Sequence, residues 1–290
     1  MRYRVNHVTT YAYAQAVDLG RHMLHLTPRA LPGQAVVASR LVADPVPTRV
    51  DEGRDHFGNW VTWMALDQPH ATFRLGLEAV VEVAFPPPPD AGATPAWERV
   101  AEAALAGGPA GWEAAEFALA SPLAPADAAV GAYAAHSFPA GRPVLAGLLD
   151  LMGRIRREFA FRPGVTTIST PVARVLAQRA GVCQDFTHLM IAGLRALGLP
   201  ARYVSGYLRT RPPPGRAPRQ GADQSHAWVG CWLGPAHGWV DLDPTNDLVV
   251  HDEHVVLAWG RDYGDISPVR GIILGGGSHS LTVAVDLAPV

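Results

Sequence analysis

Three short segments contain residue types that can carry out covalent chemistry. The first runs from Gly181 to His188 and contains Cys183, and the second, roughly forty residues later, begins at Ser225 and contains His226. The third begins at Asp243. A nucleophilic enzyme uses these groups together, because the thiol attacks, the imidazole moves the proton and the carboxylate orients the imidazole.

Cys183 opens a segment with the periodicity of a helix that is buried on one side. The apolar residues of that segment are Phe186, Leu189, Met190, Leu194 and Leu197. The thiol is therefore expected at a helix N-terminus, where free backbone N–H groups and the helix dipole favour the thiolate. Gly181 is expected to leave room for a substrate, Asp185 to cap the helix, and His188 to be a packed residue rather than the base.

The segments of His226 and Asp243 are predicted to form a β-hairpin. Apolar residues alternate from His226 to Trp232, and a turn-like stretch separates this strand from the one that ends at Asp243. If Trp232 pairs with His237, the register places His226 directly opposite Asp243 on one face. A carboxylate at that position holds the imidazole in one tautomer and stabilises its charged form, as a base that serves Cys183 requires.

The three segments resemble the core motifs of the transglutaminase-like superfamily, which is related to papain-type cysteine proteases. In this chain they read Gly-Val-Cys-Gln-Asp-Phe, His-Ala-Trp-Val and Gly-Trp-Val-Asp-Leu-Asp-Pro-Thr. The resemblance implies a catalytic triad of Cys183, His226 and Asp243, and the spacing of the third motif favours Asp243 over Asp241. It covers roughly residues 145–246, and the start of the chain resembles the N-terminal region of bacterial members.

The residue types and the resemblance together predict acyl transfer on amide or glutamine groups of a peptide or protein substrate, through a thioester. The backbone N–H of Cys183 is the first expected oxyanion donor. A cysteine protease or amidase type of hydrolysis is favoured, because water is the abundant acyl acceptor. The alternatives are a protein-glutamine gamma-glutamyltransferase, which admits an amine and excludes water, and a non-catalytic binding module.

Composition and charge argue against several other classes of protein. With 290 residues, 48% of them hydrophobic and 17% charged, the chain can bury the core of one large or two moderate domains. A net charge of -2 predicts no nucleic-acid partner and no membrane partner. The sequence has no recognisable signal peptide and no run of about eighteen apolar residues, so a cytoplasmic location is expected. Nothing in it indicates an oligomeric state.

The sequence predicts no metal and no cofactor. Its two cysteines, Cys183 and Cys231, fall on different predicted elements and are too few for a thiolate zinc site or a disulfide framework, and Cys231 is expected to be buried. His251 and His254 are the most suggestive pair of metal ligands, but no third ligand follows at a suitable spacing. An acidic calcium-binding loop is also absent from the sequence.

The chain as a whole predicts an α+β fold. Residues 1–85 alternate like short strands and predict an antiparallel, sandwich-like β domain, in which His7, Gln34 and Asn59 are most simply structural. Residues 86–95 contain four consecutive prolines and predict a stiff linker. Residues 96–290 predict a helical segment and a papain/transglutaminase-like core, with the nucleophile at a helix N-terminus packed on an antiparallel sheet.

Within that second part, individual elements follow from breaks and periodicity. Helices are predicted at 96–105, 112–119, 126–136, 143–159 and 171–178, ahead of the helix of Cys183, and strands at 201–208 and 280–286. Residues 209–221 are rich in arginine and proline and predict a solvated loop beside the site, and residues 261–271 form a polar segment expected near the site.

Overall fold

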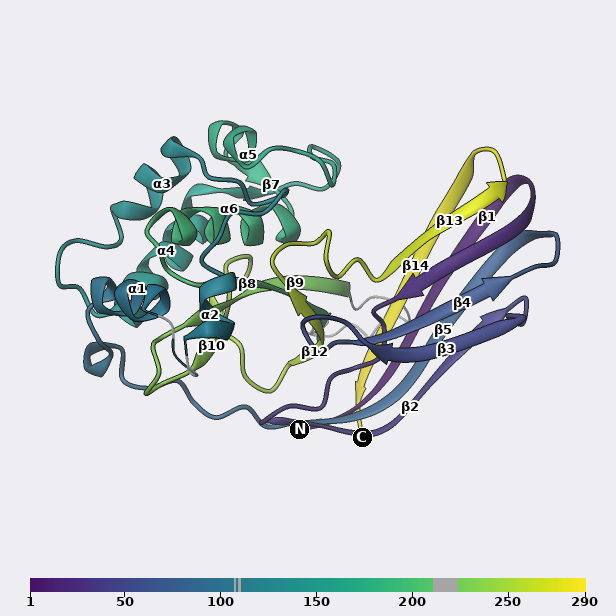
Figure 1. Ribbon diagram of the computed structural model, residues 1–290, viewed down its shortest axis with the longest axis horizontal. Coiled ribbons are helices and arrows are strands. Elements are labelled where there is room, and N and C mark those ends of the chain that lie inside the picture. The colour runs from purple at the N-terminus through teal and green to yellow at the C-terminus, as the bar shows by residue number, and fades with distance from the viewer. Residues whose placement is uncertain (107, 109–110, 211–223) are drawn as a thin grey trace, which may run out of the picture.

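The computed structural model describes residues 1–290 except 107, 109–110 and 211–223 (Figure 1). An extended β structure forms one end of the molecule, and helices with a second sheet form the other. The predicted arginine- and proline-rich loop lies outside the described residues, apart from its first two.

The N-terminal part is built around one long strand, β1 (Arg2–Leu24). Four antiparallel strands pair with it: β4 (Trp60–Leu66), β5 (His70–Val83), β13 (Val269–Gly275) and β14 (His279–Pro289). β5 and β14 flank its first half, whereas β4 and β13 flank its second half. β2 (Gln34–Asp44) extends the sheet beyond β5, and β3 (Arg49–Arg54) extends it beyond β4.

A register shift in β1 between Ala12 and Val17 separates its two halves, whose side chains share one apolar core. Leu24 and Leu66 from the second half pack with Phe73 of β5 in that core. Because a strand buried on one face places every second side chain inside, this arrangement explains the alternation in the sequence. The antiparallel N-terminal β structure is therefore confirmed.

The end of the chain completes this N-terminal sheet. The sequence predicts residues 269–290 as part of the second domain, but β13 and β14 pair with β1, and the N–H of Val290 donates to the carbonyl of Arg2 at 3.0 Å. Neither β13 nor β3 was predicted. Their exposed, mixed side chains lack a clear period of two, and pairing through the backbone leaves no local mark in the sequence.

The predicted helices are all present. They are α1 (Trp97–Leu105), α2 (Trp112–Glu116), α3 (Ala128–Ala135), α4 (Val144–Glu158), α5 (Val172–Gln178) and α6 (Cys183–Ala196). Pro86–Pro89 lie without helix or strand between β5 and a short 3-10 turn, η1 (Ala91–Ala93). Among the described residues, no helix is long and apolar enough to cross a membrane.

Helix α6 is the centre of the second part. Its residues from Asp185 to Arg195 are all buried, because α3, α5 and the second sheet surround it. Two short parallel strands, β6 (Ala160–Phe161) and β7 (Ala180–Gly181), lead the chain into it. Such complete burial fixes the position and direction of the helix, and hence of the residue at its first position.

The second sheet is antiparallel and has the order β11-β10-β9-β8-β12. Its strands are β8 (Ala201–Leu208), β9 (Gln224–Trp232), β10 (Trp239–Asp243), β11 (Leu248–Val249) and β12 (His254–Gly260). Ala227 and Val229 of β9 share a core with α6, whereas Trp228 faces the other side. Gly206 of β8 is required there, because a Cβ would collide with the carbonyl of Val255 and the ring of Trp228.

Two side-chain amides join the N-terminal sheet to the edge strand β12. Gln34 donates to the carbonyl of Val256 and accepts from its N–H, both at 2.8 Å. Asn59 likewise donates to the carbonyl of Trp259 at 2.8 Å and accepts from its N–H at 2.9 Å. These bonds satisfy backbone groups that a free sheet edge leaves unpaired, and they agree with the structural role expected for Gln34 and Asn59.

Candidate active site

Cys183 is the first residue of α6 and is partly exposed. The preceding residue, Val182, has an extended backbone, and its N–H donates to Asp185 Oδ2 at 2.7 Å. Asp185 also accepts a hydrogen bond from the hydroxyl of Thr166 at 2.7 Å, while burial raises the pKa of its carboxyl group. A carboxylate in the first turn ties the chain that enters the helix to the helix itself.

Gly181 has a different role from the one expected. A Cβ at this position would lie 2.8 Å from the Cβ of Asp185 and 2.7 Å from its Oδ2. The missing side chain therefore makes room for the capping carboxylate of Asp185, not for a substrate. The sequence could not separate these possibilities, because both need a small residue next to the helix start.

The structure brings the three predicted site residues together. His226 Nε2 lies 2.8 Å from Asp243 Oδ2, and the His226 ring lines the same cavity as Cys183. The side chains of His226 and Asp243 are 6% and 0% exposed, so the pair is shielded from water on both sides. A thiol, an imidazole and a carboxylate in sequence can pass a proton away from sulfur and stabilise the charge that results.

Asp243 is held by more partners than its imidazole. Its Oδ1 accepts from the N–H groups of Thr245 at 2.9 Å and Asn246 at 3.2 Å. Its Oδ2 accepts from Asn246 Nδ2 at 2.7 Å and lies 3.3 Å from His254 Nε2. Burial alone would raise the pKa of Asp243, but the hydrogen bonds from His226 and His254 hold it well below its usual range, so the carboxylate stays ionised.

His226 is correspondingly charged. Burial lowers the pKa of an imidazole, but here the hydrogen bond to Asp243, together with the nearby Cys183, outweighs the burial and raises the pKa of His226 to about 10. The ring can therefore hold a proton at neutral pH, between the carboxylate on one side and the sulfur on the other.

The predicted hairpin register was wrong by two residues. Trp239 pairs with Trp232, and Leu242 pairs with Val229, so Asp243 comes level with Trp228 and not with His226. The turn is longer than assumed, because the N–H of Leu233 donates to the carbonyl of Gly238 at 2.8 Å. A shift of two residues keeps the same face, and His226 still reaches Asp243 diagonally.

The histidine pair considered as a metal site is separated in the structure. His251 is exposed beside Asp252, whereas His254 is buried. The possible ligand atoms of His254, His226 and Asp243 all lie within 4.8 Å of one another. Two imidazoles and a carboxylate suit Zn²⁺, but a metal there would draw His226 away from Cys183. No local sequence signal indicates that His254 belongs with the other two, because they come from three different strands.

His188 is packed and uncharged. It is 5% exposed, its Nε2 accepts from the N–H of Tyr263 at 3.2 Å, and its ring lies 4.9 Å from that of Tyr203. Burial lowers its pKa to about 4. It therefore supports the segment of Tyr263 and makes no contact with Cys183 among those given by the structure.

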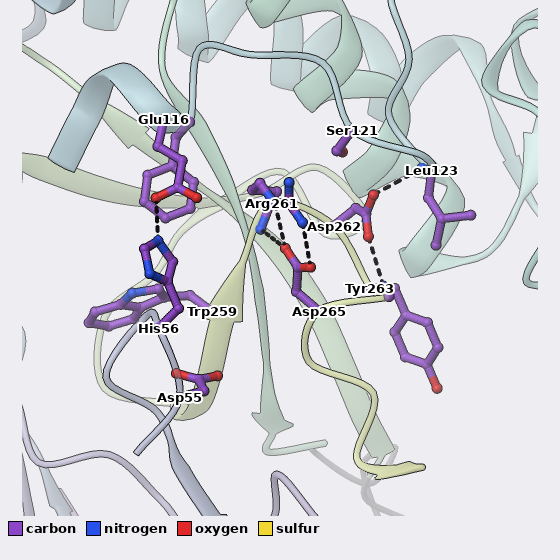
Figure 2. Close-up of polar contacts among 12 residues, drawn as sticks. Asp55, His56, Glu116, Ser121, Leu123, Trp259, Arg261, Asp262, Tyr263 and Asp265 are labelled. Atoms are coloured by element: carbon purple, nitrogen blue, oxygen red, sulfur yellow. Dashed lines mark hydrogen bonds and ion pairs between the residues drawn. The ribbon is translucent and has the colours of Figure 1, made fainter. Parts of the chain in front are cut away.

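The predicted polar segment 261–271 folds into a network beside the site (Figure 2). The carboxylate of Asp262 accepts from the N–H of Leu123 at 2.9 Å, and Arg261 forms an ion pair with Asp265 at 2.9 Å. These contacts fix the loop on both sides of Tyr263, which lines the cavity in front of Cys183.

That cavity has a volume of about 660 Å³, and the two parts of the chain both contribute to it. Cys183, Tyr203 and His226 come from the second part, whereas His7, Tyr11 and Val283 come from β1 and β14. His7 itself is fixed by Tyr207 Oη at 2.7 Å and Thr9 Oγ1 at 2.6 Å. The N-terminal sheet therefore forms one wall of the candidate active site, a role that its sequence alone does not indicate.

Comparison with known proteins agrees with this architecture. The model of the bacterial transglutaminase-like N-terminal region matches residues 3–82, and that of the transglutaminase-like superfamily matches residues 138–244. An uncharacterized protein of Mycobacterium tuberculosis is 44% identical over 99% of this chain and 93% of its own length. The chain belongs to the transglutaminase-like superfamily, whose members are generally enzymes.

Two further similarities concern the fold and the core. The crystal structure of a candidate cysteine protease from Cytophaga hutchinsonii has a TM-score of 0.76 and 22% identity, over 99% of this chain and 90% of that one. A protein-glutamine gamma-glutamyltransferase of Pseudomonas aeruginosa is 31% identical over 112 residues, which are 38% of this chain and 16% of that protein. The first similarity concerns the whole fold, and the second is confined to a part of the chain.

Proposed function

We propose that the protein is a thiol-dependent acyl-transfer enzyme that acts on amide bonds of peptides or proteins. Cys183, His226 and Asp243 are its proposed catalytic residues. The observation that carries this proposal is the hydrogen bond between His226 and the fully buried, ionised carboxylate of Asp243, on the wall of an open cavity that Cys183 also lines.

The proposed reaction has two steps, and His226 donates a proton in the first step and recovers one in the second. The sulfur of Cys183 attacks the amide carbonyl, the C–N bond breaks, and the imidazolium of His226 gives its proton to the departing amine. Water or a second amine then attacks the thioester and returns a proton to His226, and the thiolate leaves. Asp243 keeps the imidazolium oriented throughout, without itself being protonated.

The first position of a helix supplies a donor for the oxyanion of the intermediate. The N–H of Cys183 has no acceptor within α6, because the first N–H groups of a helix lack one. A charge that develops on the substrate oxygen near this N–H is stabilised by it and by the helix dipole. Gln184 and Tyr203 line the same cavity and carry further donors.

Hydrolysis is the favoured outcome for the acyl-enzyme. Cys183 is partly exposed and the cavity opens to solvent, so water has access to the thioester. Transfer to an amine is the second candidate, because the similarity to the Pseudomonas aeruginosa transferase supports it. The two outcomes need the same three residues and differ only in which acceptor reaches the thioester.

Mass spectrometry of a glutaminyl peptide library, incubated with and without a primary amine, separates these candidates. Chain scission indicates proteolysis, loss of ammonia with incorporation of water indicates deamidation, and an amine adduct indicates transfer. If folded protein at high concentration leaves the library unchanged under both conditions, the proposal is contradicted.

The second cysteine provides a matched control. Cys231 is buried on the face of β9 that packs against α6, and burial raises the pKa of its thiol. Iodoacetamide at neutral pH is therefore expected to label Cys183 and to abolish turnover, while Cys231→Ala retains both labelling and turnover. A Cys183 that resists labelling would favour a non-catalytic binding module.

A further inference from the structure

Two arginines are buried to a similar extent but have different environments. Arg195 is 7% exposed, and its guanidinium donates to the carbonyls of Phe117, Ala201 and Arg261 and to the hydroxyl of Ser121. These four acceptors compensate for the burial of its positive charge. Arg202 on β8 is 6% exposed, yet its guanidinium makes no hydrogen bond to the residues that the structure describes.

The faces of the Arg202 guanidinium are covered, but its edges make no hydrogen bond to the described residues and only a long ion pair with Asp241. Its Cζ lies 4.3 Å from the ring centre of Trp239 and 3.8 Å from that of Trp259. The nearest carboxylate is Asp241, whose Oδ1 lies 3.8 Å from Nη2, beyond hydrogen-bonding distance. Asp241 Oδ2 already accepts from the indole N–H of Trp228 at 3.0 Å. Stacking on indoles leaves the in-plane N–H groups of a guanidinium available to a planar acceptor.

Arg202 lies on the wall of a second cavity, with a volume of about 440 Å³. Most of its lining is apolar and includes Leu31, Phe85, the Pro86–Pro89 segment and Val250. None of its lining residues belongs to the cavity of Cys183. A buried donor without a partner is costly, and an apolar pocket with one such donor is the usual form of a site for a small amphiphilic ligand.

We propose that this second cavity binds a small monocarboxylate with an apolar body. The carboxylate accepts from the free edge of Arg202, and the apolar body lies against Phe85 and the Pro86–Pro89 segment. A carboxylate fits the fork of a guanidinium with two parallel hydrogen bonds, which a single carbonyl oxygen cannot form.

The charges around the cavity favour a single negative charge on the ligand. Arg29 stacks on Trp259 at 3.5 Å and adds a second positive charge close by. Asp241 and Glu113 line the cavity and oppose an added anion. The two arginines and the two carboxylates nearly cancel, so little attraction remains to offset the larger desolvation cost of a dianion such as hydrogen phosphate, and a monocarboxylate is the better match.

Isothermal titration calorimetry of the protein with phenylacetate tests the proposal. Phenylacetamide serves as the uncharged analogue of the same shape. We expect saturable binding of phenylacetate and at least about tenfold weaker binding of phenylacetamide. Quenching of tryptophan fluorescence should follow the same titration, because Trp239 and Trp259 line the cavity. Equal binding of the two compounds, or binding of neither, overturns the proposal.

Two substitutions locate the binding site. Arg202→Met should weaken phenylacetate binding at least about tenfold, because it keeps the length of the side chain but removes the donors. Arg99→Met, at an exposed arginine of α1, should leave the affinity unchanged and controls for the loss of one positive charge. Unchanged affinity in folded Arg202→Met contradicts the proposed site.

If Arg202→Met does not fold, Glu113→Gln provides a second test of the proposed site. Glu113 is exposed at the cavity, so its substitution should preserve the fold and remove repulsion. We expect phenylacetate to bind about two- to fivefold more tightly to this variant, and phenylacetamide to be unaffected. Because none of these measurements uses turnover, their outcome is independent of the proposed acyl-transfer function.

Discussion

Two buried histidines, one in each part of the molecule, are held in opposite charge states. His22 in the N-terminal sheet is 6% exposed, stacks on Phe73 with ring centres 4.4 Å apart, and burial lowers its pKa to about 4. His226 in the second part is 7% exposed, but its hydrogen bond to Asp243 and the nearby Cys183 raise its pKa to about 10.

The difference shows that the partner, and not the depth of burial, decides the charge of a buried imidazole. Desolvation disfavours the proton in both places. Around His22 no carboxylate among the described residues compensates for this desolvation, so the imidazole packs as a neutral ring. In the second part the ionised Asp243 compensates it, and the ring becomes a proton carrier beside a thiol.

The largest expected effect comes from removing the thiol that His226 faces. Cys183→Ala should lower kcat/KM by at least about a thousandfold, because the covalent step is lost while His226 and Asp243 remain. His22→Phe should leave kcat/KM within about twofold of the wild type, since His22 lines no part of the cavity. Steady-state kinetics on a substrate identified by mass spectrometry measures both. A Cys183→Ala variant with substantial turnover would contradict the assignment of the nucleophile.

Asp243→Asn should lower the pKa of His226, so that its imidazole becomes neutral like that of His22. The negative charge of Asp243 raises the pKa of His226, so without it burial lowers that pKa. The imidazolium of the wild type persists up to about pH 10, and the alkaline limb of kcat/KM should move to lower pH in the variant. The rate at neutral pH should fall by on the order of a hundred- to ten-thousandfold. An alkaline limb that stays in place would exclude His226 as the titrating group.

His22→Phe should change the acid stability of the protein. A histidine whose folded pKa is depressed binds its proton more readily in the unfolded state, so the wild type loses stability as the pH falls from 6.5 toward 4. From the pKa of about 4, this loss is roughly 2 to 3 kcal/mol for His22. Urea denaturation at pH 7 and pH 4 should show a smaller pH difference in the variant. An unchanged difference would mean that His22 is already protonated or already exposed in the folded protein.

The smallest effects concern the contacts that hold the two parts together. Asn59→Ala should lower the free energy of unfolding by about 2 kcal/mol, because it removes a buried amide and leaves the partly buried N–H and carbonyl of Trp259 without these partners. His56→Ala, which removes only the exposed ion pair with Glu116 seen in Figure 2, should have no measurable effect. Thermal denaturation of both variants compares a buried link with an exposed one. Equal effects would show that the Asn59 bonds do not hold β12.

The elements that lie within one stretch of sequence were predicted well. The helix of Cys183 followed from apolar spacing, and the strand from Ala201 to Leu208 has the predicted bounds. Both depend on a local period that side-chain burial imposes on neighbouring residues. The contact between His226 and Asp243 was also anticipated, although from an incorrect register, because an error of two residues preserves the face of a strand.

The sequence by itself determined that a cysteine opens a buried helix and that a histidine and an aspartate follow on strands. Only the tertiary structure decided that β14 joins the N-terminal sheet, that His254 reaches Asp243, and that Arg202 lines a cavity without a hydrogen bond to the described residues. These features depend on which distant strands pair and where their ends meet. Backbone hydrogen bonds are nearly the same for every residue type, so they leave little trace in the sequence of either strand.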